Sequence, residues 1–185
     1  MQNAGSRYGG TMGEEMGFFE LIETRRSVRA FKDKPLDGRT VDKILSAANS
    51  APSARNLQSY KIFVVQKKED KIKLAGATHD QDFIKDASTV LVFCADLVAA
   101  KMCGKRGVSL YSIQDATIAC AYSQLASHAL GLSSVWVGSF DEEKLHELFP
   151  ATDGFKAVAL LVIGFADEMP EKKGRKGLNE ISLRI

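Results

Sequence analysis

The spacing of apolar residues along the chain predicts several amphipathic helices. Val41, Ile44 and Ala48 recur at intervals of three and four, which places them on one face of a helix. Asp37 precedes this pattern and Pro52 follows it, and the residue before a proline avoids helical backbone angles. Further helices are predicted over residues 14–24, 67–77, 112–130 and 141–149.

Single residues mark where two of these helices end or begin. Gly131 follows the 112–130 pattern, at the position where glycine relieves left-handed strain, and Asp141 stands at the start of the next helix. The interval 98–108, "VAAKMCGKRGV", is short and interrupted by two glycines. It is predicted to be a loop.

Short runs of apolar and β-branched residues predict strands that are buried on both faces. A strand with one wet face would alternate between apolar and polar residues, and these runs do not. A mixture of such strands with helices indicates an α+β or α/β fold whose sheet is covered on both sides. The predicted strands are 60–66, 89–96, 133–140 and 155–167.

The chain is predicted to form one folded unit over residues 14–185. It contains no internal repeat and no linker long enough to divide it, and a chain of 185 residues is long enough to bury roughly 70% of its unfolded surface. Residues 1–13, "MQNAGSRYGGTMG", are rich in glycine and small polar residues. They are predicted to be a mobile lead-in.

Composition and charge argue against several classes of protein. The 25 basic and 23 acidic residues nearly balance, so nothing in the net charge of +2 favours nucleic acid or a membrane surface, and any anion site must be local. There is no apolar run of about 20 residues and no signal-peptide pattern. The 3 cysteines and 3 histidines lack the spacing of redox or metal motifs. We therefore predict a cytoplasmic protein without a metal.

Four polar segments could carry chemistry, and each also has an ordinary explanation as solvated surface, turn or core strand. Considered together they describe a site for a mononucleotide-like cofactor. Arginine suits phosphate, the amides of Asn56 and Gln58 suit the edge of a flat heterocycle, and Gly138 permits close approach to the backbone. The chain has neither a P-loop nor a dinucleotide fingerprint. The segments are "RRSVR", "APSARNLQS", "VWVGSF" and "KKGRK".

The order of these segments resembles that of the FMN-dependent nitroreductase family. The similarity is collinear from about Phe19 to Ile181. One segment alone would be weak evidence, but five in the family's order and spacing outweigh the ordinary explanations. The five are "ETRRSVRAF", "AANSAPSARNLQSYKIFVV", "SIQDATIACAYSQLASHALGLSSVWVGSFD", "ALLVIGFAD" and "KKGRKGL".

The resemblance implies an α+β three-layer sandwich, with a mostly antiparallel sheet between helices. It also implies an intertwined homodimer with FMN at the subunit interface. The side chains implied near the phosphate are Arg25, Lys173 and Arg175, while Asn56 would bond the flavin ring and Arg29 would lie near its pyrimidine edge. The full set of implied FMN-binding positions is Arg25, Arg26, Ser27, Arg29, Ser53, Asn56, Gln58, Trp136, Val137, Gly138, Ser139, Lys173 and Arg175.

The family's activity implies a ping-pong oxidoreductase, in which NAD(P)H gives hydride to flavin N5 and an acceptor such as a nitroaromatic or quinone then replaces it. No side chain is assigned as a catalytic acid or base. The alternatives are another flavin reaction on the same fold, such as reductive dehalogenation or flavin breakdown, and a non-catalytic flavin-binding protein. A nucleic-acid-binding module is disfavoured by the near-neutral charge.

The chain also departs from the family pattern. The common N-x-Q-P-W reads as N-L-Q-S-Y at residues 56–60, and Gly138 replaces an acidic residue found near N5 in some members. The segment that often covers the substrate, between the second strand and the long helix, is short. These departures affect the expected substrate more than the expected flavin site.

Overall fold

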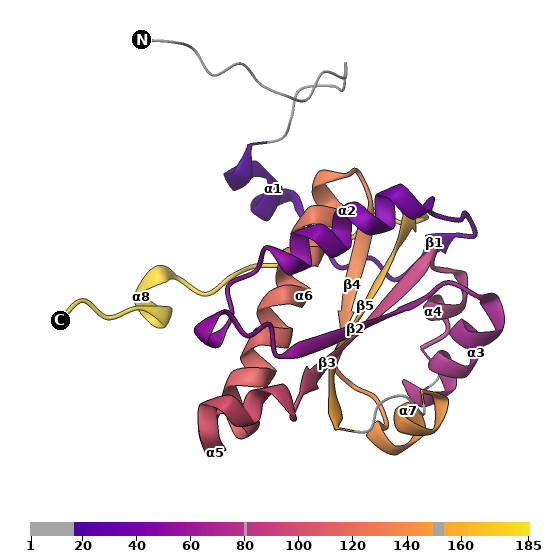
Figure 1. The fold of residues 1–185 in the computed structure, drawn as a ribbon. Helices are drawn as coiled ribbons and strands as arrows, with labels where there is room; N and C mark the ends of the chain where they lie inside the picture. Colours follow the sequence, from indigo (N-terminus) through magenta and orange to yellow (C-terminus); the bar gives the residue numbers. More distant parts are fainter. Residues whose placement is uncertain (1–16, 80, 150–153) are drawn as a thin grey trace, which may run out of the picture.

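A five-stranded sheet lies at the centre of the structure, a computed structural model that describes residues 17–79, 81–149 and 154–185 (Figure 1). β5 pairs with β3 along one edge and with β4 along the other, β1 pairs with the C-terminal end of β5, and β2 is the neighbour of β3. Each of these pairings is antiparallel, which confirms the predicted sheet. The strands are β1 (Phe31–Lys32), β2 (Tyr60–Val65), β3 (Thr89–Asp96), β4 (Ser133–Val137) and β5 (Phe155–Ala166). The predicted lead-in, 1–13, lies outside the described residues.

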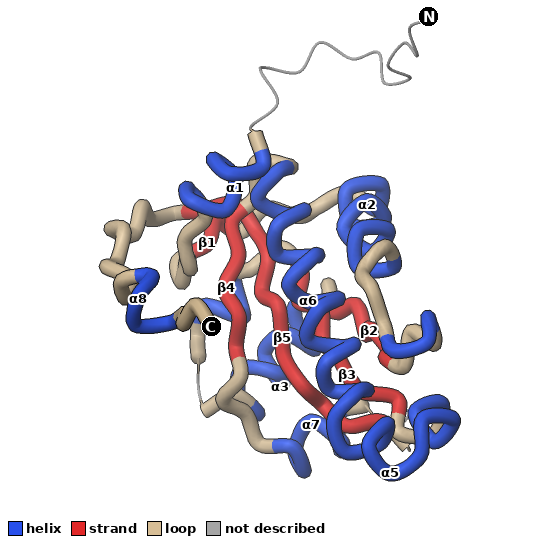
Figure 2. The backbone as a smooth tube through the Cα atoms, turned by 90° about the vertical axis from the view of Figure 1, so that its left-hand side faces the viewer, coloured by secondary structure: helices blue, strands red, loops and turns tan. Residues whose placement is uncertain are grey.

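Helices cover both faces of this sheet and give the predicted three layers (Figures 1 and 2). α2 and α6 lie on one face, while α3, α4 and α7 lie on the other. α4 and α8 were not predicted, because four residues are too few to show a helical period. The helices are α1 (Phe18–Thr24), α2 (Gly38–Asn49), α3 (Lys68–Ala77), α4 (Phe83–Asp86), α5 (Gly104–Arg106), α6 (Ser112–Ala129), α7 (Glu142–Leu148) and α8 (Leu178–Ile181).

The alternation of side chains along β3 explains why its sequence is continuously apolar. Val90 and Val92 are buried on the α3 and α7 side, and Leu91 and Phe93 are buried on the α2 and α6 side. β5 divides its side chains in the same way. β2 was also predicted to be buried, and this is wrong in part: β2 is the last strand of the sheet, and Val64 is 41% exposed.

The interval predicted to be a loop, 98–108, is helical instead. It forms η2 (Ala99–Cys103), α5 and a π-helical turn, η3 (Gly107–Tyr111), which continues into α6. Gly104 has a φ of 65° at the junction of the first two turns. A Cβ on Gly107 would overlap the carbonyl oxygen of Ala100, so this glycine allows close packing between turns. The glycines therefore shape the helical segment and do not interrupt it.

The predicted helix ends are confirmed by their hydrogen bonds and backbone angles. The Asp37 side chain accepts a hydrogen bond from Thr40 N at 3.0 Å, and Asp141 accepts one from Glu143 N at 3.0 Å. Gly131, just beyond α6, has a φ of 74°.

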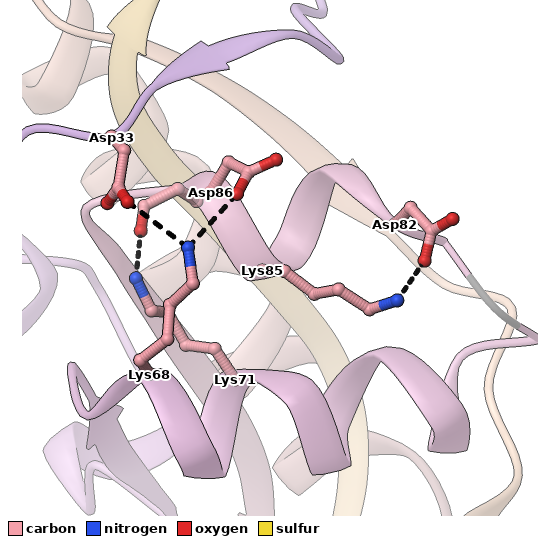
Figure 3. Close-up of polar contacts among 7 residues, drawn as sticks. Asp33, Lys68, Lys71, Asp82, Lys85 and Asp86 are labelled. Carbon is pink, nitrogen blue, oxygen red and sulfur yellow. Dashed lines mark hydrogen bonds and ion pairs between the residues drawn. The ribbon is translucent and has the colours of Figure 1, made fainter.

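Charged side chains connect α3 to its neighbours on the outer face (Figure 3). Lys68 Nζ lies 3.2 Å from Asp33 and 3.1 Å from Asp86. Lys71 is only 4% exposed and donates to the carbonyl oxygen of Ala87. Burial, followed by the charge of Lys68, lowers the pKa of Lys71. The buried ammonium group of Lys71 therefore helps to fix α3 against the chain at Ala87.

Within the described part of the chain, no helix has both the length and the apolar character that crossing a bilayer requires.

Candidate functional site

A basic cleft of about 650 Å³ lies between the end of α1 and the segment that precedes α8. One wall is the arginine segment, residues 25–29, and the other is the basic segment, residues 170–175. These walls are more than 140 residues apart in sequence. The cleft brings together six of the predicted positions: Arg25, Arg26, Ser27, Arg29, Lys173 and Arg175.

The arginine segment is held against the edge of the sheet. α1 ends at Thr24, and the chain then becomes extended and runs beside β4, where Val28 N donates to Ser134 O at 3.2 Å. Val28 is buried and anchors the segment, while the backbone N–H of Arg29 donates to the carboxylate of Glu168. The arginine side chains are therefore presented from a fixed backbone.

Arg25 and Arg26 differ in how their guanidinium groups are satisfied. Arg26 Nη1 donates to the carbonyl oxygens of Glu23 at 2.7 Å and Arg25 at 3.0 Å. Arg25 Nη1 is buried and has no hydrogen-bond partner among the described residues. Burial, then the charge of Arg175 and then that of Arg26, lowers the pKa of Arg25. An anion in the cleft would give this buried donor an acceptor and would offset the repulsion between cations.

An ion pair fixes the second wall of the cleft to α1. Lys172 Nζ lies 2.6 Å from a carboxylate oxygen of Glu23, and this hydrogen bond and charge lower the pKa of Glu23. Lys172 is thereby used within the protein, while the exposed side chains of Lys173 and Arg175 line the cleft.

A second group of predicted residues lies in the loop around η1 (Ala54–Asn56), between α2 and β2. Ser53 Oγ accepts a hydrogen bond from Gln58 N at 3.0 Å, and Gln58 Nε2 donates to Asn56 Oδ1 at 2.7 Å. Arg55, Asn56 and Gln58 have left-handed φ angles of 53°, 57° and 44°. Such angles are costly for residues other than glycine, so the loop requires support from its surroundings.

Asp115 on α6 provides that support, and the sequence analysis missed it. Its Oδ1 accepts from Ala54 N at 2.9 Å and its Oδ2 from Ser59 Oγ at 2.5 Å, although the residue is only 2% exposed. Burial, followed by the Asp115 charge, raises the pKa of Tyr60. The available signal was an acidic residue among apolar ones in "SIQDATIACAY".

A separate cavity of about 460 Å³ lies beside this loop. It is lined by Ser53 and Ala54 from the loop and by Gln114, Asp115 and Ile118 from α6. The α6 side chains that support the loop thus also form the wall of a hollow next to it.

A third predicted group lies at the end of β4. Trp136 is partly buried against the α2 and α6 side, and Val137 is buried on the opposite side. Gly138 and Ser139 are exposed, and Ser139 O accepts from Gln81 Nε2 at 3.2 Å. A Cβ on Gly138 would meet no atom closer than 3.7 Å, so packing within the subunit does not require glycine there.

The described residues of one subunit do not bring the three groups into one cavity. The basic cleft contains none of residues 53–58 or 136–139, and Ser53 lines the separate cavity beside α6. In Figure 2, α8 and the loop that leads into β2 lie on opposite sides of α6. A ligand that contacts all three groups would therefore have to extend beyond the basic cleft.

Comparisons with known proteins agree with this fold and give it a family. The model of the Nitroreductase family matches residues 22–165. An NAD(P)H FMN reductase of Bacillus subtilis is 32% identical over 169 residues, covering 83% of this chain and 68% of its own. An NADH dehydrogenase of Thermus thermophilus is 27% identical over 187 residues, covering 86% and 91%.

Among solved structures, B. megaterium NfrA2 superposes with a TM-score of 0.83 at 28% identity. The match covers 90% of this chain and 73% of that one. The family model ends before Lys173 and Arg175, so their position in the basic cleft is the evidence that connects them to the site.

Replacing Asp115 with alanine is expected to lower the free energy of unfolding by about 2–4 kcal/mol. Two donors would lose a charged acceptor in the interior, and such hydrogen bonds contribute about 1.5–3 kcal/mol each. Urea unfolding measures the loss, and hydrogen exchange at the Ala54 amide tests whether the loop opens. Asp42→Ala, on the exposed face of α2, is the matched control. Unchanged exchange at Ala54 would show that Asp115 does not support the loop.

Proposed function

The chain belongs to the nitroreductase family, and we propose that it is an FMN-dependent oxidoreductase that takes hydride from NAD(P)H and reduces an organic acceptor in a ping-pong reaction. Relatives named as an FMN reductase and an NADH dehydrogenase support both the cofactor and the electron donor. The acceptor is proposed to be a nitroaromatic, a quinone or a compound of similar chemistry.

One observation carries the proposal: the buried, unpartnered Nη1 of Arg25 lies in a cleft where it is close enough to Arg175 for their charges to interact. The phosphate of FMN carries nearly two negative charges and three strong acceptor oxygens, which fits this arrangement. Arg25, Lys173 and Arg175 would hold the phosphate, and the hydroxyl of Ser27 would add a donor. Arg26, whose guanidinium is bonded to backbone carbonyls, would contribute mainly charge.

The other predicted residues would hold the flavin ring. The Asn56 amide is already oriented by Gln58 and could bond a polar ring edge, while the backbone at Val137–Ser139 could lie along the ring. When bound, FMN supplies a ring that accepts hydride from a nicotinamide and passes it to the acceptor. Arg29 would favour the reduced ring through Coulomb attraction at its pyrimidine edge. No side chain is assigned to proton transfer.

We also propose that the site is completed by a second copy of the chain in a homodimer. The three groups of site residues do not meet within one subunit, and both walls of the basic cleft continue into exposed apolar side chains. Phe19 on α1 is 79% exposed, and Leu183 beyond α8 is 86% exposed. Other apolar side chains of α1 and α8 are exposed as well. Exposed apolar surface of this kind is typical of a subunit interface, and a twofold dimer would use each surface twice.

Arg25→Ala and Arg175→Ala are each expected to weaken FMN binding roughly ten- to hundred-fold. Each change removes charge-assisted hydrogen bonds of about 1.5–3 kcal/mol. Quenching of flavin fluorescence during titration gives the dissociation constant. Arg39→Ala, an exposed arginine of α2 outside the cleft, should leave affinity unchanged. The phosphate assignment fails if both cleft variants stay within twofold of the parent.

The protein is expected to sediment as a dimer of the 20.2 kDa chain at low micromolar concentration. Phe19→Asp should shift it towards the monomer, because a charge would be buried at the interface. Ile72→Glu, on the exposed side of α3, is the control for adding an acidic residue. A monomer that retains stoichiometric FMN would contradict the proposal of a shared site.

FMN-loaded protein is expected to oxidise NADH or NADPH in the presence of a nitroaromatic or a quinone. Double-reciprocal plots at several acceptor concentrations should give parallel lines, the pattern of a ping-pong reaction. Free FMN at the same concentration is the control. Bound flavin without turnover above this control would identify a non-catalytic flavin-binding protein, and intersecting lines would contradict the ping-pong mechanism.

A further inference from the structure

Next to the basic cleft lies a smaller cavity of about 140 Å³, which the proposed function does not use. It is bounded by the end of α1, the arginine segment, the C-terminal end of α6 and β4. Arg25 and Arg26 line both this cavity and the basic cleft. Ser134, which is only 2% exposed, also lines it, and within the described part of the chain Ser134 Oγ has no hydrogen-bond partner. The cavity is therefore a neighbour of the basic cleft, and two arginines line both of them.

His128, near the end of α6, is the titratable ring in this cavity. Its Nε2 lies 3.0 Å from Thr24 Oγ1, and that hydroxyl is 2.7 Å from the Glu20 carbonyl oxygen. A hydroxyl has one hydrogen to donate, so Thr24 donates to Glu20 and accepts from the ring. His128 thus connects α6 to the last residue of α1, directly before Arg25.

The backbone of Leu132 provides a second acceptor for this ring. Leu132 lines the same cavity, and its backbone favours the protonated form of His128, the direction expected of a carbonyl acceptor. A neutral imidazole carries one N–H, whereas an imidazolium carries two. Only the protonated ring can donate to Thr24 and Leu132 at the same time.

Two influences oppose that protonation while the basic cleft holds no anion. Burial comes first, and the charges of Arg25 and Arg26 add to it, so the pKa of His128 is lowered. The acidic group facing this cavity is Glu168, whose carboxylate accepts from the backbone N–H of Arg29. The balance at His128 therefore depends on how much of the arginine charge is neutralised.

We propose that His128 is a positioning residue that takes up a proton when a dianion occupies the basic cleft. The dianion offsets the charges of Arg25 and Arg26, and the protonated ring then donates to both Thr24 and Leu132. This draws the end of α6 onto the end of α1 and holds the arginine segment in its binding position. The identity of the dianion, the phosphate of FMN, rests on the proposed function.

This linkage has a definite sign. With the cleft occupied, the pKa of His128 is higher than with the cleft empty, so binding takes up a proton at pH values between the two. The contribution of His128 to affinity is absent above both pKa values and develops as the pH falls through the higher one. Each unit of difference between them corresponds to a tenfold change in affinity.

The direct test is proton NMR of the ring resonances of the histidines, titrated with and without saturating FMN. His128→Gln and His146→Gln assign the resonances, and His146, exposed on α7, is the internal control. The His128 pKa is expected to rise by roughly one unit with FMN while that of His146 stays constant. Sulfate, a dianion over the whole pH range used, serves as a second probe that lacks the flavin.

The second test compares FMN dissociation constants of His128→Gln and the parent from about pH 8.5 to 5.5. Glutamine can still donate to Thr24 but cannot take up a proton, and titration of the phosphate itself cancels in the ratio. The ratio of variant to parent is expected to be near one at high pH and to rise towards roughly tenfold as the pH falls through the two pKa values. A merely structural role would give a ratio that does not change with pH.

The outcomes separate this inference from the proposed function. Tight FMN binding with an unchanged His128 pKa and a flat ratio overturns the proton linkage and leaves the flavin function standing. No FMN binding, with a His128 pKa that sulfate raises, supports the linkage and contradicts the flavin function. A His128 pKa that neither probe changes overturns the linkage.

Discussion

Strand β5 must be covered on both faces and paired along both edges, and the rest of the structure follows from this constraint. Its residues from Ala159 to Ile163 are fully buried, so every backbone group there needs a partner within the protein. β3 satisfies one edge of this stretch, and β4 satisfies the other. The arginine segment runs beside β4, where Val28 N donates to Ser134 O, and this contact fixes the segment at the border of the sheet.

That border concentrates positive charge, because the tail of the chain returns to it with more basic residues. The Glu23–Lys172 ion pair holds the two walls of the basic cleft together, although cations line both of them. Repulsion between Arg25 and Arg175 and the unpartnered Nη1 of Arg25 are costs that the folded chain carries. An anion in the cleft removes both costs, which is the physical basis for the proposed phosphate site and for its link to His128.

The remaining site residues depend on a different part of the fold. The loop around η1 has three left-handed residues, and the buried carboxylate of Asp115 holds it in place. This loop and the basic cleft lie apart in one subunit, and exposed apolar side chains flank the cleft. Oligomerisation would therefore be a requirement of the proposed flavin site as well as a means of covering apolar surface.

The sequence by itself determined those features that depend on near neighbours in the chain. Helical spacing in α2, the caps Asp37 and Asp141, and the continuous apolar runs of β3 and β5 follow from local sterics and side-chain period. Only the tertiary structure decided which elements lie at an edge, why Gly107 packs inside a helical segment, and what Asp115 and His128 contact. These outcomes depend on residues far apart in the sequence, whose contacts carry no local signal.

The basic residues of the site illustrate both cases. Their positive charge is evident in the sequence. Their convergence in one cleft is produced by the pairing of β4 and β5 and by the return of the C-terminal segment.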